Sequence, residues 1–279
     1  MPLFELLRGL ARTARTLPGI YHWRRAAYIK RFRDNLRSNM FLGVFDTFEE
    51  AAASAPATRP VGYDNPQSAS MYVSDEYMRM QPHDYPAALW LARSLHEGHR
   101  GIADLGGSVG IKFYAFSRVV DYPSDMRWTV IEVPAVVKAG VELSDTHGGG
   151  PRLMFCESRA AIDGAETLIA SGSLQYLPRT LADILRSWEA MPRRIIVNAT
   201  PLHESRSFYT LNSIGTAFCP YRVSSRAEFV AELSDLGYSL RDEWRRAGKL
   251  LRLPFDPGYG DVPYCGFCFD QMPRRRGWP

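Results

Sequence analysis

Residues 102–110 of the chain read IADLGGSVG, and this stretch decides the fold. An apolar strand over 101–105 runs into a turn that contains three glycines, and an amphipathic helix is expected to follow over 111–120. Glycine lets the backbone turn tightly and lets a ligand approach closely, because it has no Cβ. In an open parallel sheet, ligands bind beside such turns at the carboxyl ends of the strands. The pattern predicts a ligand site here, the alternative being a glycine-containing turn without a ligand.

Short apolar segments and amphipathic segments alternate on both sides of this stretch. Further strands are expected at 128–132, 153–156, 167–170 and 194–199, and further helices at 85–95, 134–143 and 180–190. Short, fully apolar strands that alternate with helices are typical of a parallel sheet that is covered on both faces. The predicted fold class is therefore α/β, with a doubly wound, mostly parallel sheet.

The C-terminal part departs from this alternation. Ser225 and Glu228 have the spacing of a capping box and predict a helix that ends at Gly237. Two strands, 238–244 and 264–269, then follow with no helix between them. Because parallel strands need a crossover between them, we expect these two to be antiparallel.

The four cysteines do not suggest a disulfide framework in a chain of 279 residues. Cys265 and Cys268 have CxxC spacing, but a zinc site would need a second ligand pair, and none is visible in the sequence. The surrounding YCGFCFD alternates like a strand, so we expect both thiols to pack in the core. No His/Asp cluster has ligand spacing, and no metal is expected.

The N-terminal part is basic. The first 40 residues carry nine Arg and Lys and two acidic residues, so their formal charge is +7, whereas the whole chain has only +4. We expect residues 1–84 to be a helical extension or lid, with a short helix at 47–53, and residues 85–279 to be the main domain. The basic segment could lie on an anionic membrane surface or hold an acidic partner; the alternative is a solvated helix face.

No apolar run reaches the roughly 20 residues that span a bilayer, and the sequence MPLFELLRGLARTAR lacks the apolar centre of a signal peptide. The expected location is the cytoplasm, with peripheral contact to the inner membrane face left open.

Two carboxylates decide between cofactors. A dinucleotide fingerprint needs glycine where Leu105 stands, and Asp104 places a negative charge where a pyrophosphate would bind. S-adenosylmethionine carries an ammonium and a sulfonium, which suit a carboxylate. Glu132 follows Gly110 by 22 residues, at the end of the next strand, where an acid can accept hydrogen bonds from ribose hydroxyls. The pattern favours S-adenosylmethionine over NAD.

The segment Asp104-x-Gly106-x-Ser108-x-Gly110 resembles the first motif of class I S-adenosylmethionine-dependent methyltransferases, with Ser108 replacing the middle glycine. Glu132 matches their second-strand acid, residues 170–177 resemble their fourth-strand segment, and the terminal helix and hairpin resemble the end of their seven-stranded sheet, whose last strand is antiparallel. The resemblance covers about residues 85–272. It implies that the cofactor, released as S-adenosylhomocysteine, is held by Asp104, Gly106, Gly107, Ser108, Gly110, Glu132, Val133, Glu157, Ser158, Ser171, Gly172 and Ser173.

More narrowly, four segments resemble a little-characterised family of bacterial methyltransferases associated with surface-polysaccharide biosynthesis. These segments are FLGVFDTFEEA (41–51), GYD (62–64), SGSLQYLP (171–178) and FYTLNSIG (208–215). This resemblance implies a fold and a cofactor more than it implies a substrate.

The acceptor site is expected in the connection 200–225, which is too long for a routine loop of a compact domain. A histidine that titrates near neutrality can remove the proton of a hydroxyl acceptor, so we assign His203 as the base and Glu204 as the residue that orients it or the substrate. Four tyrosines are candidate acceptor contacts, two in the connection and two in the cap upstream of the core: Tyr209, Tyr221, Tyr63 and Tyr72.

The predicted reaction is methyl transfer to an oxygen, or less favourably a nitrogen, of a small molecule or glycan. One alternative is a nucleotide-dependent oxidoreductase or sugar-modifying enzyme on a related fold, and another is a non-catalytic binding module that keeps the cofactor fold. Action on nucleic acid is disfavoured because the residues after 40 together carry a formal charge of −3. The acceptor and the oligomeric state are left open.

Overall fold

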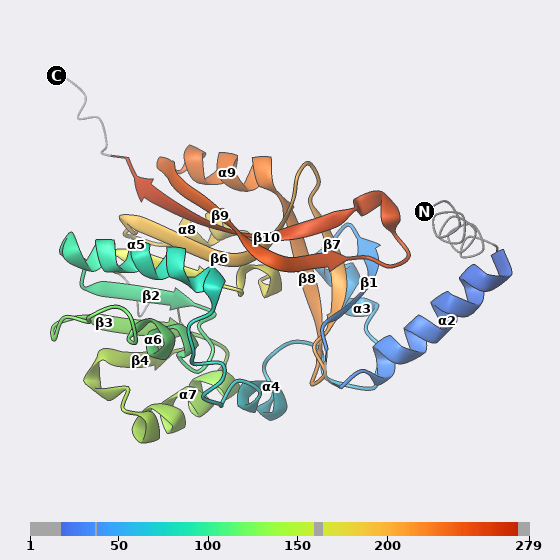
Figure 1. The fold of residues 1–279 in the computed structure, drawn as a ribbon, viewed down its shortest axis with the longest axis horizontal. Helices are drawn as coiled ribbons and strands as arrows, with labels where there is room; N and C mark the ends of the chain where they lie inside the picture. The colour runs from blue at the N-terminus through green and yellow to red at the C-terminus, as the bar shows by residue number, and fades with distance from the viewer. Residues whose placement is uncertain (1–17, 37, 159–163, 273–279) are drawn as a thin grey trace, which may run out of the picture.

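The computed structural model describes residues 18–36, 38–158 and 164–272 (Figure 1). Seven strands form the predicted core of the sheet. In spatial order they are β4 (Leu153–Cys156), β3 (Arg127–Ile131), β2 (Gly101–Leu105), β5 (Thr167–Ser171), β6 (Arg194–His203), β10 (Asp261–Gln271) and β9 (Tyr238–Arg252). The first five are parallel, and β10 is antiparallel to both β6 and β9. The predicted fold class and the antiparallel end are confirmed.

Helices cover both faces of this sheet because alternate residues of each strand point to opposite sides. On β2, Ile102 packs in a core with α5 (Tyr85–His96) and α6 (Ile111–Phe116). Its neighbour Ala103 packs in a second core, with α8 (Leu181–Leu185) and α9 (Arg226–Asp235). The helix α7 (Pro134–His147) follows β3. The helices expected at 111–120 and 180–190 exist but end earlier.

The expectation of a long loop over 200–225 was wrong. The strand β6 continues to His203, and two further strands follow, β7 (Phe208–Ser213) and β8 (Phe218–Ser225). Together with β1 (Met40–Phe45) they extend the described sheet to ten strands. Sequence periodicity missed β7 because its inward positions are polar: Asn212 is fully buried and donates to the carbonyl of Met40 at 3.1 Å.

The N-terminal segments attach to this extension. The basic helix α2 (Pro18–Asp34) stands away from the sheet in Figure 1 and is anchored by Phe32, which stacks on Phe218 with ring centroids 5.4 Å apart. The predicted short helix is α3 (Phe48–Ala53), where Thr47 and Glu50 form a capping box. Further short helices are α4 (Pro66–Ser70), η1 (Pro82–Asp84), η2 (Gly150–Arg152), η4 (Leu174–Tyr176) and η5 (Pro257–Tyr259). Within the described residues, no helix is both long and apolar enough to cross a membrane.

The CxxC pair lies in strand β10, as the alternating pattern predicts. Cys265 packs in the core beneath α8 and α9, and Cys268 packs in the core beneath α5 and α6, so the two thiols point to opposite faces. Burial raises the pKa of both thiols above the ordinary value of a cysteine. Both are therefore packing residues.

Candidate cofactor and acceptor site

The glycine turn after β2 is packed tightly against two side chains. Gly106 has a φ of 71°, and a Cβ built on it would lie 2.3 Å from the Cβ of Ser173. A Cβ on Gly107 would lie 2.3 Å from Oδ2 of Asp104. Ser108, where the resembled motif has its middle glycine, takes a φ of 55°, which is uncommon for a residue with a side chain. Internal packing thus requires both glycines, independently of any ligand.

Asp104 is fully buried behind this turn. Its Oδ2 accepts a hydrogen bond from Nε1 of Trp128 at 3.1 Å, and its Oδ1 has no hydrogen-bond partner among the described residues. Burial raises the pKa of Asp104 to about 7; the Trp128 hydrogen bond opposes this shift, and the nearby carboxylate of Glu132 adds to it. Asp104 is therefore a buried carboxyl group packed directly behind Gly107, and its raised pKa places its ionisation near neutral pH.

Glu132 joins the end of β3 to the glycine turn. Its Oε1 accepts from the backbone N–H of Ser108 at 3.0 Å, and its Oε2 accepts from the N–H of Val133 at 3.1 Å. Burial raises the pKa of Glu132, and these two hydrogen bonds oppose the shift. A carboxylate held by two N–H groups still has free lone pairs, so Glu132 can also accept from hydroxyls of a ligand.

The segment after β5 supports the turn from the other side. Ser173 donates its hydroxyl proton to the carbonyl of Leu105, which is the contact that requires glycine at 106. The N–H of Gly172 donates to the carbonyl of Asn198 on β6 at 2.8 Å, and Ser171 ends β5 beside it. Ser171, Gly172 and Ser173 therefore lie at the same sheet edge as the glycine turn and Glu132.

A buried ion pair, which the sequence analysis missed, holds this edge together. Asp84 is fully buried, and Nζ of Lys112 on α6 lies 2.7 Å and 2.8 Å from its two oxygens. Asn198 donates from Nδ2 to Oδ1 of Asp84 at 2.9 Å and accepts from Nε1 of Trp244 on β9 at 3.0 Å. The local sequence signals for this cluster are an asparagine in an apolar strand and an acid before an apolar helix. Sequence analysis could not pair them because they lie 114 residues apart in the chain.

The predicted cap lies across the carboxyl ends of β3 and β2. Asp64 accepts from the N–H of Ala135 at the start of α7, at 3.0 Å. Tyr72 packs with residues of α7 and the glycine turn, and the negative charge of Glu132 contributes to its raised pKa, after burial and neighbouring side chains. The hydroxyls of Tyr63 and Tyr72 lie 3.5 Å apart. The segment therefore places both tyrosines close to the predicted cofactor residues.

A cluster of tyrosines, which we call the tyrosine chamber, adjoins this cap; its members are Tyr63, Tyr72, Tyr176, Tyr221 and Tyr264. The ring of Tyr176 lies 4.9 Å from that of Tyr63 and 5.0 Å from that of Tyr221, measured between centroids. The hydroxyls of Tyr221 and Tyr264 are 2.8 Å apart. Tyr176 and Tyr264 escaped the sequence analysis because they come from η4 and β10, far apart in the chain.

Tyr209 does not join the chamber. It pairs with Arg222 across β7 and β8, and the guanidinium of Arg222 lies 5.3 Å from its ring centroid. Since Arg222 follows Tyr221, the two point to opposite faces of β8. The structure therefore brings three of the four predicted tyrosines together and leaves Tyr209 on the other face.

The predicted base is held in a local turn. Nδ1 of His203 accepts from the backbone N–H groups of Ser205 and Arg206, each at 3.1 Å, and Glu204 is exposed. His203 ends β6 five residues beyond Asn198, roughly 16 Å along an extended strand. The structure does not bring it beside the glycine turn, and its role as a base stays a prediction.

The predicted adenine contacts lie one strand further out. Glu157 and Ser158 follow the carboxyl end of β4, which pairs with β3, and both are exposed. They share the sheet edge of Glu132 and Val133, and their roles stay predictions.

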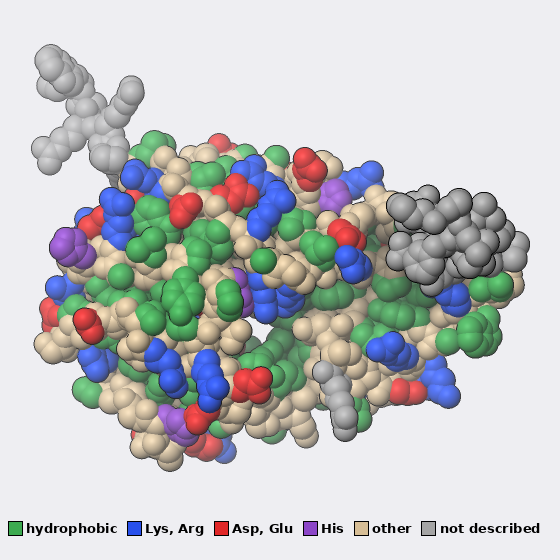
Figure 2. All heavy atoms as spheres, viewed as in Figure 1, with side chains coloured by type: hydrophobic (Ala, Val, Ile, Leu, Met, Phe, Trp, Pro, Cys, Tyr) green, Lys and Arg blue, Asp and Glu red, His purple; other side chains and the backbone are tan. Residues whose placement is uncertain are grey.

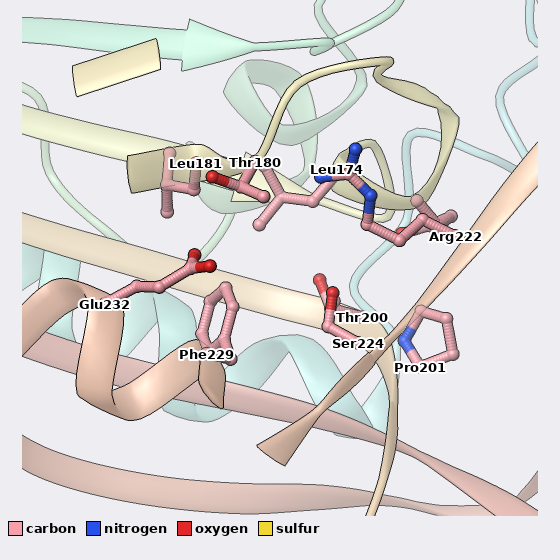
Figure 3. Close-up of a pocket in the computed structure, with 10 residues that line it drawn as sticks. Leu174, Thr180, Leu181, Thr200, Pro201, Arg222, Ser224, Phe229 and Glu232 are labelled. Atoms are coloured by element: carbon pink, nitrogen blue, oxygen red, sulfur yellow. The ribbon is translucent and has the colours of Figure 1, made fainter. Parts of the chain in front are cut away.

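A small pocket lies behind the segment after β5, where Thr180, Thr200 and Glu232 converge from three elements (Figure 3). Its volume of about 20 Å³ is enough for one water molecule but not for a cofactor. Gln175 Oε1, Thr200 Oγ1 and Arg222 Nε line it and are buried without a hydrogen-bond partner among the described residues. This polar pocket supports Gln175, whose Nε2 donates to the carbonyl of Gly172 at 2.7 Å.

A scan against protein-family models and a search of curated proteins found no match. Several solved structures are similar. The CcbJ methyltransferase from Streptomyces caelestis has a TM-score of 0.49 and 14% identity, over 76% of this chain and 98% of that one. Mitomycin 7-O-methyltransferase MmcR has a TM-score of 0.47 and 15% identity, over 92% of this chain and 70% of that one. Magnesium protoporphyrin IX methyltransferase from Synechocystis PCC 6803, with bound S-adenosylhomocysteine, has a TM-score of 0.44 and 12% identity. The match covers 67% of this chain and 81% of that one. The strand order described above, with β10 antiparallel between β6 and β9, makes the fold Rossmann-like, of the methyltransferase type.

Proposed function

We propose that the protein transfers a methyl group from S-adenosylmethionine to an oxygen of a small molecule or glycan. The observation that carries this proposal is the bond between Glu132, at the end of β3, and the N–H of Ser108 in the glycine turn after β2. It places a hydroxyl-accepting carboxylate beside a turn that a ligand can approach closely. In this fold, β2 adjoins the switch point of the sheet, where ligands bind.

Charge favours the sulfonium cofactor over a dinucleotide. Asp104 and Glu132 both lie at the turn, and the charge of Glu132 contributes to the raised pKa of Asp104. Two carboxylates would repel a pyrophosphate and attract an ammonium or sulfonium group. The residues at this edge thus fit S-adenosylmethionine better than NAD.

When bound, the cofactor supplies a methyl group that the acceptor oxygen displaces in line from sulfur. The protein's contribution is mainly positioning, which can supply much of the rate enhancement of such a displacement. Glu132 would accept the ribose hydroxyls, Asp104 would stabilise the cationic end, and the tyrosine chamber would orient the acceptor and exclude water. A surface-polysaccharide precursor as acceptor rests on the sequence resemblance.

The test is calorimetric titration of the protein with S-adenosylmethionine, S-adenosylhomocysteine and NAD. We expect micromolar binding of the first two and a loss of roughly 10–100-fold in Glu132→Gln, because one charge-assisted acceptor of ribose hydroxyls is removed. Asp145→Asn, an exposed acid near the end of α7, is the matched control and should bind like the parent. Binding of NAD in preference to both sulfur compounds would make an oxidoreductase the better proposal.

We also propose that α2 contacts an anionic membrane surface. The side chains of Trp23 and Ile20 are 72% and 41% exposed, and Arg24 and Arg25 lie beside them on an exposed helix. Aromatic and basic residues on one short helix suit the interface of a charged bilayer. We expect co-sedimentation with phosphatidylserine-containing vesicles that weakens in high salt and in Trp23→Ser. Equal sedimentation with purely zwitterionic vesicles would contradict this proposal.

A further inference from the structure

Two cations of β9, Arg246 and Lys249, lie close to the tyrosine chamber. Between the pairs Leu250–Pro263 and Arg245–Cys265, four residues of β9 (246–249) stand opposite one residue of β10 (264), so β9 bulges here. Gly248 in the bulge has a φ of 75°. In a regular strand, Arg246 and Lys249 would point to opposite faces, since they are three residues apart. Instead, Nζ of Lys249 lies 4.4 Å from the ring centroid of Tyr264, and the charge of Arg246 influences both Lys249 and Tyr264.

Neither cation has a counter-ion in the part of the chain that the structure describes. Arg246 and Lys249 are partly buried, yet neither forms an ion pair or hydrogen bond with any residue that the structure describes. Two other buried cations are paired with acids, Lys112 with Asp84 and Arg194 with Asp270 at 2.6 Å, whereas the buried Arg222 donates to the carbonyl of Pro178. Burial and the charge of Arg246 lower the pKa of Lys249 to about 8, and burial lowers that of Arg246. Unpaired, partly buried charges are unfavourable, and a bound anion would offset this.

The neighbouring titratable groups do not neutralise Arg246 and Lys249. Asp84 attracts Arg246 but is already bonded to Lys112 and Asn198. Burial lowers the pKa of His83 to about 4, and the positive charges around it act in the same direction, so His83 is neutral at pH 7. The group facing the chamber is therefore positive, with no acid free to neutralise it within the described residues.

The bulge lies on the acceptor side of the predicted cofactor site. Just before it, Trp244 donates to Asn198, and Asn198 lies beside Ser171 and Gly172 at the end of β5. Figure 2 shows a hollow near the centre of the molecule, with Lys or Arg atoms and hydrophobic atoms at its rim. The start of the bulge therefore lies next to the segment after β5.

We propose that the acceptor carries a compact oxyanion, a carboxylate or a phosphate, and that Arg246 and Lys249 bind it while the tyrosine chamber holds the rest of the molecule. This proposal rests on the proposed methyl transfer. A guanidinium binds either oxyanion through two parallel N–H groups, and an ammonium adds a point charge. The tyrosine rings offer flat packing surfaces, and their hydroxyls offer hydrogen bonds.

The test is calorimetric titration of the S-adenosylhomocysteine-saturated protein with inorganic phosphate, glucuronate and glucose. We expect at least one anion to bind tenfold or more tightly than glucose, and the stronger of the two identifies the oxyanion. Arg246→Met and Lys249→Met should each weaken that binding tenfold or more, whereas Lys249→Arg should retain most of it. Arg245→Met, an exposed neighbour on β9, is the matched control and should leave it unchanged.

Binding of both anions no tighter than glucose would overturn the proposal. So would anion binding that persists in Arg246→Met and Lys249→Met while their thermal unfolding matches that of the parent. S-adenosylhomocysteine is titrated first into each protein, and this titration separates the two proposals. Anion binding without binding of S-adenosylhomocysteine would contradict the proposed methyl transfer but not the anion site. Binding of S-adenosylhomocysteine without a preference for anions would contradict the anion site but not the proposed methyl transfer.

Discussion

At pH 8, the Asp104→Asn variant is expected to unfold with a free energy about 2–4 kcal/mol larger than that of the parent chain. The pKa of Asp104 is about 7 in the folded protein and 3.8 in a free side chain. Its charged form is therefore disfavoured by folding, and the parent should lose stability as the pH rises from about 4 to 7. Asparagine keeps the shape and can still accept from Trp128, but it cannot ionise. Urea unfolding of both proteins at pH 5, 7 and 8 measures the difference.

The same substitution is expected to weaken the binding of S-adenosylmethionine. In the parent, affinity should rise as Asp104 ionises through pH 7, because the carboxylate attracts the cofactor's sulfonium. S-adenosylhomocysteine lacks the sulfonium charge, so its affinity should depend less on pH, and Asp104→Asn should show little dependence for either. Asp145→Asn again serves as the control. Parallel pH profiles for both compounds in the parent would contradict this role of Asp104.

The Gly106→Ala variant is expected to lose about 2–4 kcal/mol of stability and at least tenfold in cofactor affinity. A left-handed alanine accounts for about 1 kcal/mol, and the collision of its Cβ with Ser173 adds about 1–3 kcal/mol. Because Ser173 also bonds to Leu105, the displacement spreads to the end of β2. Chemical unfolding and titration with S-adenosylhomocysteine measure the two effects.

Gly98→Ala is the matched control for this variant. Gly98 has a φ of 89°, similar to that of Gly106, but a Cβ built there meets nothing within 4 Å. Its substitution should lose only about 1 kcal/mol. Adding Ser173→Gly to Gly106→Ala removes the colliding Cβ and should recover part of the loss. Equal losses in Gly98→Ala and Gly106→Ala would show that close packing at the turn is unimportant.

The core of the sheet could be predicted because its signals are local. The strands β2, β3, β4 and β5 are short apolar runs, and residues 106–110 form a glycine turn directly after one of them. Such runs are apolar on both faces and need no knowledge of their neighbours to be recognised. The carboxyl ends of parallel strands meet at one edge, so the prediction that Glu132 lies near the glycine turn needed only the fold class.

The extension and the acceptor side could not be predicted in this way. Thr210 and Asn212 are fully buried in β7 and make hydrogen bonds to β1, so burial there leaves no apolar pattern. The connection was mistaken for a loop for this reason. Within it, only the register of β7 and β8 separates Tyr221, which enters the chamber, from Tyr209, which faces away.

The sequence by itself determined the α/β class, the order of the core elements, the glycine turn and the acid that binds it. Tertiary structure alone decided which side chains share the proposed acceptor side: the tyrosine chamber draws on four separate segments, and the bulge in β9 places Lys249 over the ring of Tyr264. The physical reason is the range of the interactions. Strand and turn propensities act over a few residues, whereas a buried polar cluster forms only when distant segments pack and satisfy one another's charges and hydrogen bonds.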